Sequence, residues 1–462
     1  MTRQIRLTGF IAFSPVHLSP GLWAHPRSRD LDYKDLDHWV DLARLLERGR
    51  FDALIIADGI GIHDVYGGTA DAAIRSGAQV PKHDPLMLVS ALAHATTHLG
   101  FGVTASTSHE LPAVLARRFS TLDHFTDGRI GWNIATGVSD SGARAFGREA
   151  VIGHDARYER ADEFLDVTYK LWEGSWQDGA VLRDRASGLF ADPGKVHRIR
   201  HRGAHFDLDT IHLAEPSPQR TPFLFQAGAS PRGRAFAARH AEAVLVGGPT
   251  RASVASSVRD IRARRAALGR DPRDIAVFTL ATLIVAPTRE EARAKHDEYR
   301  RYSDPDGVLA LLSGWTGIDL SRFDLDAPLR PGGQRDDAVL SVIDGFTRAD
   351  PDRVWTLREV ITHTGIGGRG PLLVGSPADV ADEMEAWVAE ADVDGFNLSY
   401  AFLPETFADV VDHLVPGLQR RGLYKRDYAP GSLRAKLTGS DRLKPSHPGA
   451  AFRDRARIAP AA

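Results

Sequence analysis

Short apolar runs alternate with longer segments of helical periodicity along most of this 462-residue chain. Each run has the length of a strand, and the segment after it repeats apolar residues at the spacing of an amphipathic helix. This alternation is typical of parallel βαβ units, because a crossover helix returns the chain to the start of the next parallel strand. An open sheet and a closed (β/α)8 TIM barrel both satisfy the number of runs. The runs are residues 7–13, 51–59, 99–107, 128–137, 221–228, 241–248, 275–287 and 393–400.

Two long insertions interrupt the alternation, and a tail follows it. Residues 174–220 are polar and turn-rich, and residues 303–370 contain proline and glycine clusters. Loops this long inside a compact domain are usually lids or binding elements, so we expect both insertions to serve a site. We expect residues 1–437 to form a single domain. The proline-rich, basic tail 438–462 is expected to be extended, either mobile or lying on a neighbour.

Charge and composition exclude several classes of function. Lysine plus arginine number 58 and aspartate plus glutamate 60, so the net charge of −2 leaves no electrostatic footprint for nucleic acid or an acidic membrane. The absence of cysteine rules out disulfides and thiol nucleophiles and fits a reducing compartment. No segment approaches the roughly 18 uninterrupted apolar residues of a spanning helix, and the N-terminus lacks a signal-cleavage pattern. We therefore expect a cytoplasmic protein.

The stretch GIGGRG at 365–370 has the spacing of a dinucleotide-binding fingerprint. That fingerprint has to leave a strand and open a helix. Here Pro371 and a further strand-like segment follow instead. We interpret the stretch as a flexible loop.

Metal-ligand patterns are incomplete. HATTH at 94–98 has the spacing of a helical histidine pair but lacks the glutamate of the zinc hydrolases. A metal-dependent barrel hydrolase could use Asp58, His63 and Asp64, but it would need further ligands at strand ends, where this chain has threonine, asparagine and glutamine. We expect no metal site, and the hydrolase remains an alternative.

Polar side chains stand at the ends of several predicted strands, namely Asp58, Thr104, Asn133 and Gln226. The carboxyl ends of all strands in a parallel barrel meet at one face, so these side chains would converge on one ligand. An amide such as Asn133 can both donate to and accept from a ring edge that presents both kinds of group.

The segment PFLFQAGASPRGRAF predicts an anion site. It reads as a strand, then Gly228, then Ser230 as the N-cap of a helix with Pro231 at its first position. Free backbone amides, a hydroxyl and the positive helix end would hold a phosphate there. An ordinary capped helix explains the segment equally well, because every helix needs a start.

Longer motifs carry a family resemblance. LARRFSTLDHFTDGRIGWNIATG, ARYERADEFLDVTYKLWEGSW and FQAGASPRGRAFAARHAEAVLVG resemble the nitrilotriacetate monooxygenase branch of the bacterial luciferase-like flavoproteins, over about residues 5–437. The resemblance implies a TIM barrel with insertions that binds reduced FMN from a separate NAD(P)H-dependent reductase. It further implies that O₂ forms a flavin C4a-hydroperoxide, that the substrate is a small or medium organic molecule, and that the protein is a homodimer or homotetramer.

The same resemblance assigns roles to single residues near the flavin ring. It implies that Asp58 and Thr104 lie near the isoalloxazine and Asn133 at its polar edge. The candidate catalytic residues are Asn133, His17 and His63, since imidazole titrates near neutrality and could exchange a proton with peroxide or substrate. A purely structural role for either histidine stays open.

The phosphate end of the flavin is assigned in the same way. His154 and Tyr158 are expected beside the ribityl chain and phosphate, and they would share one helix face because they are four residues apart. The amides of Gly228 and Ala229 and the hydroxyl of Ser230 would complete the phosphate cradle.

Other classes of protein remain open at this stage. A non-catalytic flavin-binding or storage protein would keep the phosphate cradle without a substrate cavity, and oxygen consumption would separate it from an enzyme. A deazaflavin-dependent dehydrogenase is a further alternative. The segments around the flavin match the monooxygenase branch more closely than those on the substrate side, so the substrate is left open.

Overall fold

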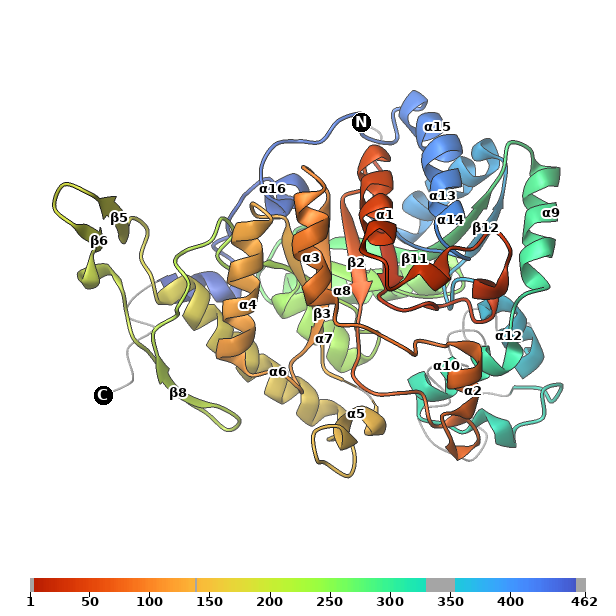
Figure 1. Ribbon diagram of the computed structural model, residues 1–462, viewed down its shortest axis with the longest axis horizontal. Coiled ribbons are helices and arrows are strands. Elements are labelled where there is room, and N and C mark those ends of the chain that lie inside the picture. The colour runs from red at the N-terminus through yellow and green to blue at the C-terminus, as the bar shows by residue number, and fades with distance from the viewer. Residues whose placement is uncertain (1–3, 138, 330–353, 454–462) are drawn as a thin grey trace.

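Eight parallel strands close into a barrel in the computed structural model, which describes residues 4–137, 139–329 and 354–453 (Figure 1). The ring closes because β13 pairs with β1, with Arg6 opposite Gly395, and β10 pairs with β11. The predicted (β/α)8 barrel is therefore confirmed, and the open sheet is excluded. In ring order the strands are β1 (Arg6–Ala12), β2 (Ala53–Ala57), β3 (Gly100–Ser106), β4 (Ile130–Ala135), β9 (Phe223–Gln226), β10 (Ala243–Val246), β11 (Ala276–Val285) and β13 (Gly395–Ser399).

Helices surround the barrel because each buries one apolar face against the strands. In α4, Pro112 occupies the first turn and Leu115 and Phe119 are buried. Among the described residues, no helix is both long and apolar enough to cross a bilayer. The helices are α1 (Leu36–Arg48), α2 (Asp71–Ser76), α3 (Pro85–His94), α4 (Pro112–Phe125), α5 (Asp140–Arg144), α6 (His154–Tyr169), α7 (Pro231–His240), α8 (Arg251–Ala267), α9 (Arg289–Arg300), α10 (Pro305–Thr316), α12 (Leu357–Thr364), α13 (Pro377–Ala391), α14 (Glu405–Asp409), α15 (Val415–Arg420) and α16 (Leu433–Thr438).

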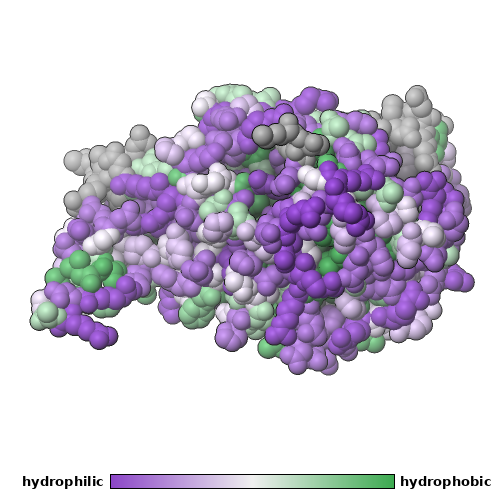
Figure 2. Space-filling model, turned by 90° about the horizontal axis from the view of Figure 1, so that it is seen from above, coloured by the Kyte–Doolittle hydropathy of each residue, from purple (hydrophilic) through white to green (hydrophobic). Residues whose placement is uncertain are grey.

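The two insertions differ in their structure. Residues 174–220 form two hairpins, β5 (Val181–Asp184) with β6 (Leu189–Ala191), and β7 (Ile199–Arg202) with β8 (Asp207–Thr210). The β5–β6 hairpin projects at one end of the molecule, where Figure 2 shows a hydrophobic cluster on an otherwise mainly hydrophilic face. The insertion 303–370 contributes α10 and α12, and its part from 330 to 353 lies outside the described residues.

One additional strand was not among the eight predicted. β12 (Leu372–Gly375) pairs with the far end of β11, at Thr282–Val285, beyond the segment of β11 that pairs with β10. It thus extends the sheet outside the ring. The long apolar run 275–287 serves two neighbours in succession, which explains its length.

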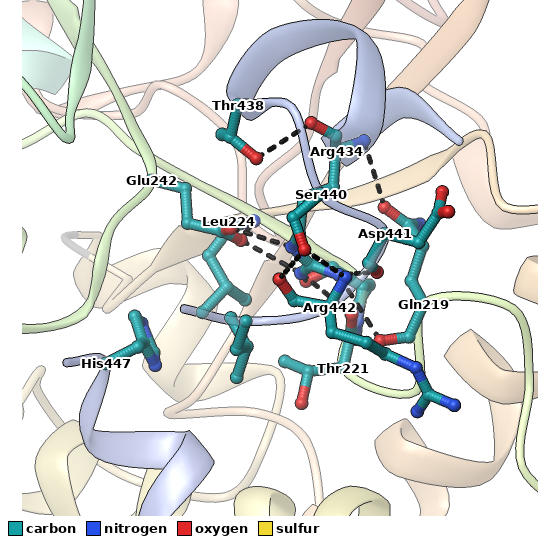
Figure 3. Close-up of polar contacts among 12 residues, drawn as sticks. Gln219, Thr221, Leu224, Glu242, Arg434, Thr438, Ser440, Asp441, Arg442 and His447 are labelled. Atoms are coloured by element: carbon teal, nitrogen blue, oxygen red, sulfur yellow. Dashed lines mark hydrogen bonds and ion pairs between the residues drawn. The ribbon is translucent and has the colours of Figure 1, made fainter. Parts of the chain in front are cut away.

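Residues 438–453, the described part of the tail, pack on the chain's own barrel (Figure 3). Arg434 of α16 is fully buried and forms a two-point ion pair with Glu242 at 2.7 and 2.9 Å. Further along, His447 is buried and its Nε2 lies 2.8 Å from the carbonyl oxygen of His240. Buried polar contacts hold this proline-rich segment to the barrel. Residues 454–462 lie outside the described residues.

The barrel interior is filled from its amino end. Leu433 and Leu437 of α16 join the inward-facing residues Phe223, Phe225 and Phe278 in one apolar cluster. The backbone N–H of Leu433 donates to the carbonyl oxygen of Gly128 at 2.9 Å, just before β4 begins. The amino end is therefore closed, and any ligand must enter at the carboxyl ends of the strands.

Candidate active site

Three adjoining cavities of about 400, 290 and 270 Å³ lie at the carboxyl ends of the barrel strands. The first two share Asp58, Gln79 and Lys82, and the second shares Asn133 and Ala227 with the third. Because the three cavities share lining residues at the same end of the barrel, we call them together the mouth. Its combined size suits a cofactor together with a substrate.

Two buried amides at the mouth have hydrogen-bonding capacity to spare. Asn133 on β4 donates from Nδ2 to the hydroxyl of Thr104 on β3 at 2.8 Å. The Asn133 Oδ1 atom and the Gln226 Oε1 atom are buried without a partner among the described residues. A buried acceptor without a partner costs free energy, so both atoms fit a ligand that brings donors, as the edge of a flavin ring does.

The turn after β9 has the predicted architecture. Ser230 caps α7, accepting from the Gly233 N–H at 3.0 Å, and Pro231 occupies the first turn. Gly228 lines the third cavity, and a side chain at this position would overlap the amide of Gln226. The turn thus presents main-chain amides and a hydroxyl at a helix N-terminus, which fits a phosphate group.

Tyr158 completes this end of the mouth. Burial raises the pKa of its phenol, and the opposing influence of a hydrogen bond with Ser230 is smaller. The Tyr158 hydroxyl lies 2.7 Å and the Ser230 hydroxyl 3.1 Å from where a Cβ on Gly233 would stand. His154 begins the same helix, with its ring centroid 5.2 Å from that of Tyr158, and its Nδ1 lies 2.6 Å from Asp155. The structure therefore brings Tyr158 to the predicted cradle, whereas His154 lies at its solvent-exposed rim.

Asp58 and Lys82 carry opposite charges in the first cavity. Burial raises the pKa of Asp58, and the positive charge of Lys82 partly opposes that rise. Burial likewise lowers the pKa of Lys82, which Asp58 partly offsets. Each group therefore helps to keep the other ionised at the predicted ring-binding region.

The two candidate histidines occupy different environments. His63 lines the mouth, where its Nε2 lies 3.3 Å from the Oε1 atom of Gln79, and burial lowers its pKa. Gln79 donates in turn to the carbonyl oxygen of His17 at 3.0 Å. His17 itself is 2% exposed, stacks edge-on against Phe10 and has a pKa lowered to about 3 by burial. His17 is thus a neutral core imidazole behind the cavity wall, and His63 is the histidine that a ligand can reach.

A family model described as luciferase-like monooxygenase matches residues 10–395. The chain belongs to this luciferase-like monooxygenase family. It is 46% identical to the dimethyl-sulfide monooxygenase of Hyphomicrobium sulfonivorans, covering 98% of this chain and 95% of that protein. It is 44% identical to the long-chain alkane monooxygenase of Geobacillus thermodenitrificans (strain NG80-2), covering 98% and 99%. The class of the enzyme is accordingly an oxygen-incorporating, flavin-dependent monooxygenase.

Solved structures agree over nearly the whole chain. The crystal structure of DmoA from Hyphomicrobium sulfonivorans superimposes with a TM-score of 0.92 at 46% identity, covering 99% of this chain and 97% of that one. A riboflavin lyase crystallised with modified FMN superimposes with a TM-score of 0.89 at 36% identity, covering 98% of this chain and 100% of that one. The family's two-component character is reflected in the name of another relative, nitrilotriacetate monooxygenase component A of Aminobacter aminovorans, which is 36% identical over 94% of this chain and 96% of that protein.

Several residues that line the mouth of this luciferase-like monooxygenase are not predicted from the sequence. Lys82, His109, Trp315 and Arg369 come from loops and from α10, not from strand ends. The GIGGRG stretch is interpreted from sequence as a flexible loop because it does not fit a dinucleotide site, although its arginine could have indicated a ligand-binding role. Of the two insertions, 303–370 supplies wall residues of the mouth, whereas none of the described mouth-lining residues comes from 174–220.

Proposed function

We propose that this chain is the oxygenase component of a two-component monooxygenase that uses reduced FMN and O₂. One observation carries the proposal: Asn133, whose buried amide oxygen has no partner among the described residues, lines the same cavity of the mouth as Gly228 and Ala229 of the phosphate-type turn. The two ends of the cavity complement the two ends of FMN. One end offers hydrogen bonds to the edge of the ring, and the other offers anion binding. Similarity to an FMN-containing riboflavin lyase supports the same cofactor.

The chain's own groups have distinct tasks in this proposal. Ser230, Tyr158 and the Gly228–Ala229 amides bind the phosphate, and Asn133 orients the ring from β4 with support from Thr104. When bound, reduced FMN supplies the electrons that activate O₂ for insertion of one oxygen atom into the substrate. His63 is the candidate for holding or moving a proton at its ring nitrogen, and Gln79 fixes that ring.

The substrate side is the first and second cavities. Apolar walls from Ile60, Ile134 and Trp315 stand beside the polar groups of Lys82 and Gln79. This mixture suits a small or medium organic molecule, and the names of relatives make dimethyl sulfide and a long-chain alkane the first compounds to test. We propose a separate NAD(P)H-dependent flavin reductase as the partner, and a homodimer or homotetramer as the assembly.

Anaerobic titration with reduced FMN tests the cofactor assignment. Ser230→Asp keeps a good N-cap but adds a negative charge against the phosphate, so binding should be lost while the protein stays folded. Ser376→Asp is the matched control, because Ser376 caps α13 and is also followed by a first-turn proline. Tight binding by the wild type and the control, but not by Ser230→Asp, supports the proposal.

Admission of oxygen with each test compound then separates an oxygenase from a flavin-binding protein. Oxygenated product that depends on both flavin and compound is the expected result. Failure of the wild type to bind any flavin would refute the proposal. Flavin binding with no oxygenated product from any compound, the electrons of the reduced flavin passing to O₂ as hydrogen peroxide, would favour the storage protein.

A further inference from the structure

The glycine-rich loop 365–370 is pressed against β11 rather than free. Gly367 and Gly368 have φ values of +77° and +84°, a region that favours glycine. A Cβ on Gly367 would overlap the side chain of Thr282, and one on Gly370 would overlap the carbonyl group of Leu280. The Gly367 N–H also donates to the Ser19 hydroxyl at 2.9 Å. The loop therefore has a defined course, which the prediction of a flexible loop missed.

This course brings Arg369 to the mouth. Arg369 lines the same cavity of about 270 Å³ as Asn133, Gly228 and Ala229. Its side chain is accessible to water, yet the surrounding protein desolvates the guanidinium and lowers its pKa. A guanidinium remains protonated at neutral pH even so.

Arg369 has no charge partner among the residues that the structure describes: the contact recorded for its guanidinium is the ring of Trp315, 5.2 Å from centroid to Cζ. The other arginine in this cavity, Arg234, is paired with Asp260 and also donates to the carbonyl oxygen of Ala229. Of the two arginines in this cavity, Arg234 is thus neutralised by a carboxylate, whereas Arg369 has no carboxylate partner among the described residues. An unbalanced, partly desolvated cation is costly unless a ligand supplies negative charge.

We propose that Arg369 faces the flavin ring and selectively stabilises its reduced, anionic form, an inference that rests on the proposed FMN site. The phosphate is negatively charged in both redox states, whereas the ring is neutral when oxidised and becomes an anion when reduced and deprotonated at N1. The phosphate end already has Ser230, Tyr158 and a helix N-terminus. A cation at the ring therefore discriminates between redox states, which suits a component that must capture reduced flavin.

Binding of oxidised FMN, reduced FMN and reduced riboflavin to the wild type, Arg369→Gln and Arg369→Lys tests this inference without turnover. Arg369→Gln should weaken binding of reduced FMN about tenfold and that of oxidised FMN much less, which corresponds to a fall of about 30 mV in the potential of the bound two-electron couple. Reduced riboflavin should respond like reduced FMN. Arg369→Lys should retain most of the selectivity. Arg358→Gln, at a surface arginine of α12 paired with Asp326, is the control and should change nothing.

Three results would overturn the inference in distinguishable ways. Equal losses for both redox states of FMN, with riboflavin unaffected, would assign Arg369 to the phosphate. Unchanged binding in a folded Arg369→Gln, alongside normal wild-type binding, would remove Arg369 from the flavin site and leave the proposed function intact. No flavin binding by the wild type would refute the proposed function itself.

Discussion

Asn133 donates from its side-chain amide to the hydroxyl of Thr104 at 2.8 Å, directly across neighbouring strands β4 and β3. This bond fixes the amide orientation, so that its oxygen is the atom left buried and without a partner. Thr104 thus holds the amide of Asn133 so that the Asn133 oxygen is a preorganised acceptor at the mouth. It acts only because the two strands are paired in this register.

Replacement of Asn133 by leucine should weaken flavin binding about fivefold, since a net hydrogen bond contributes about 1 kcal/mol. Thr104→Val should have a smaller effect, because it leaves the amide present but free to turn. Fluorescence titration with FMN measures both affinities. Equal affinity in the wild type and Asn133→Leu, with unchanged melting temperature, would contradict the assignment of Asn133 to the ring edge.

Lys82→Met should raise the pKa of Asp58 further, because an opposing positive charge is removed from a carboxyl whose pKa burial already raises. The pH at which flavin affinity changes should therefore move upward in this variant. Asp58→Asn should abolish that pH dependence. FMN titrations over a series of pH values provide the measurement, and identical pH profiles in all three proteins would show that Asp58 is not coupled to the site.

His17 should make the fold less stable in mild acid. Its pKa is about 3 in the folded chain and 6.5 as a free side chain. Between these two pH values the imidazole is therefore protonated in the unfolded state and neutral in the folded state. The stability it contributes is complete above the unfolded pKa and is lost as the pH falls toward the folded one, at about 1.4 kcal/mol per pH unit. His17→Gln should flatten the pH dependence of urea unfolding by one proton. Parallel curves for the two proteins would contradict the depressed pKa.

Arg434→Met should destabilise the barrel by about 3–5 kcal/mol, because it leaves the carboxylate of Glu242 buried and unpaired. The double substitution Arg434→Met with Glu242→Gln removes that stranded charge and should recover part of the loss. Urea unfolding of the wild type, both single variants and the double variant forms a complete cycle. A loss from Arg434→Met below about 1 kcal/mol would mean that the ion pair is not integral to the fold.

The eight barrel strands followed from local pattern, and the structure confirms each, although with tighter bounds. The run predicted at 221–228 contains a strand of only four residues, Phe223–Gln226, because Gly228 and Ser230 already belong to the turn. The polar residues Asp58, Thr104 and Asn133 were predictable as neighbours for the same reason. Parallel strands that are consecutive in the chain also lie side by side in a barrel, so strand-end residues meet whatever the loops do.

Sequence by itself determined the alternation of strands and helices and the capped turn at Ser230, since these depend on residues close together in the chain, whereas closure of the ring rests on the distant pairing of β13 with β1. Tertiary structure alone decided that Arg369 and Trp315 share the mouth with Asn133, and that α16 closes the opposite end through Arg434 and Glu242. Those contacts join segments far apart in the chain, and their geometry depends on how each loop packs on the barrel. Periodicity reports which face of an element is buried, but it carries no information about which distant loop will cover it.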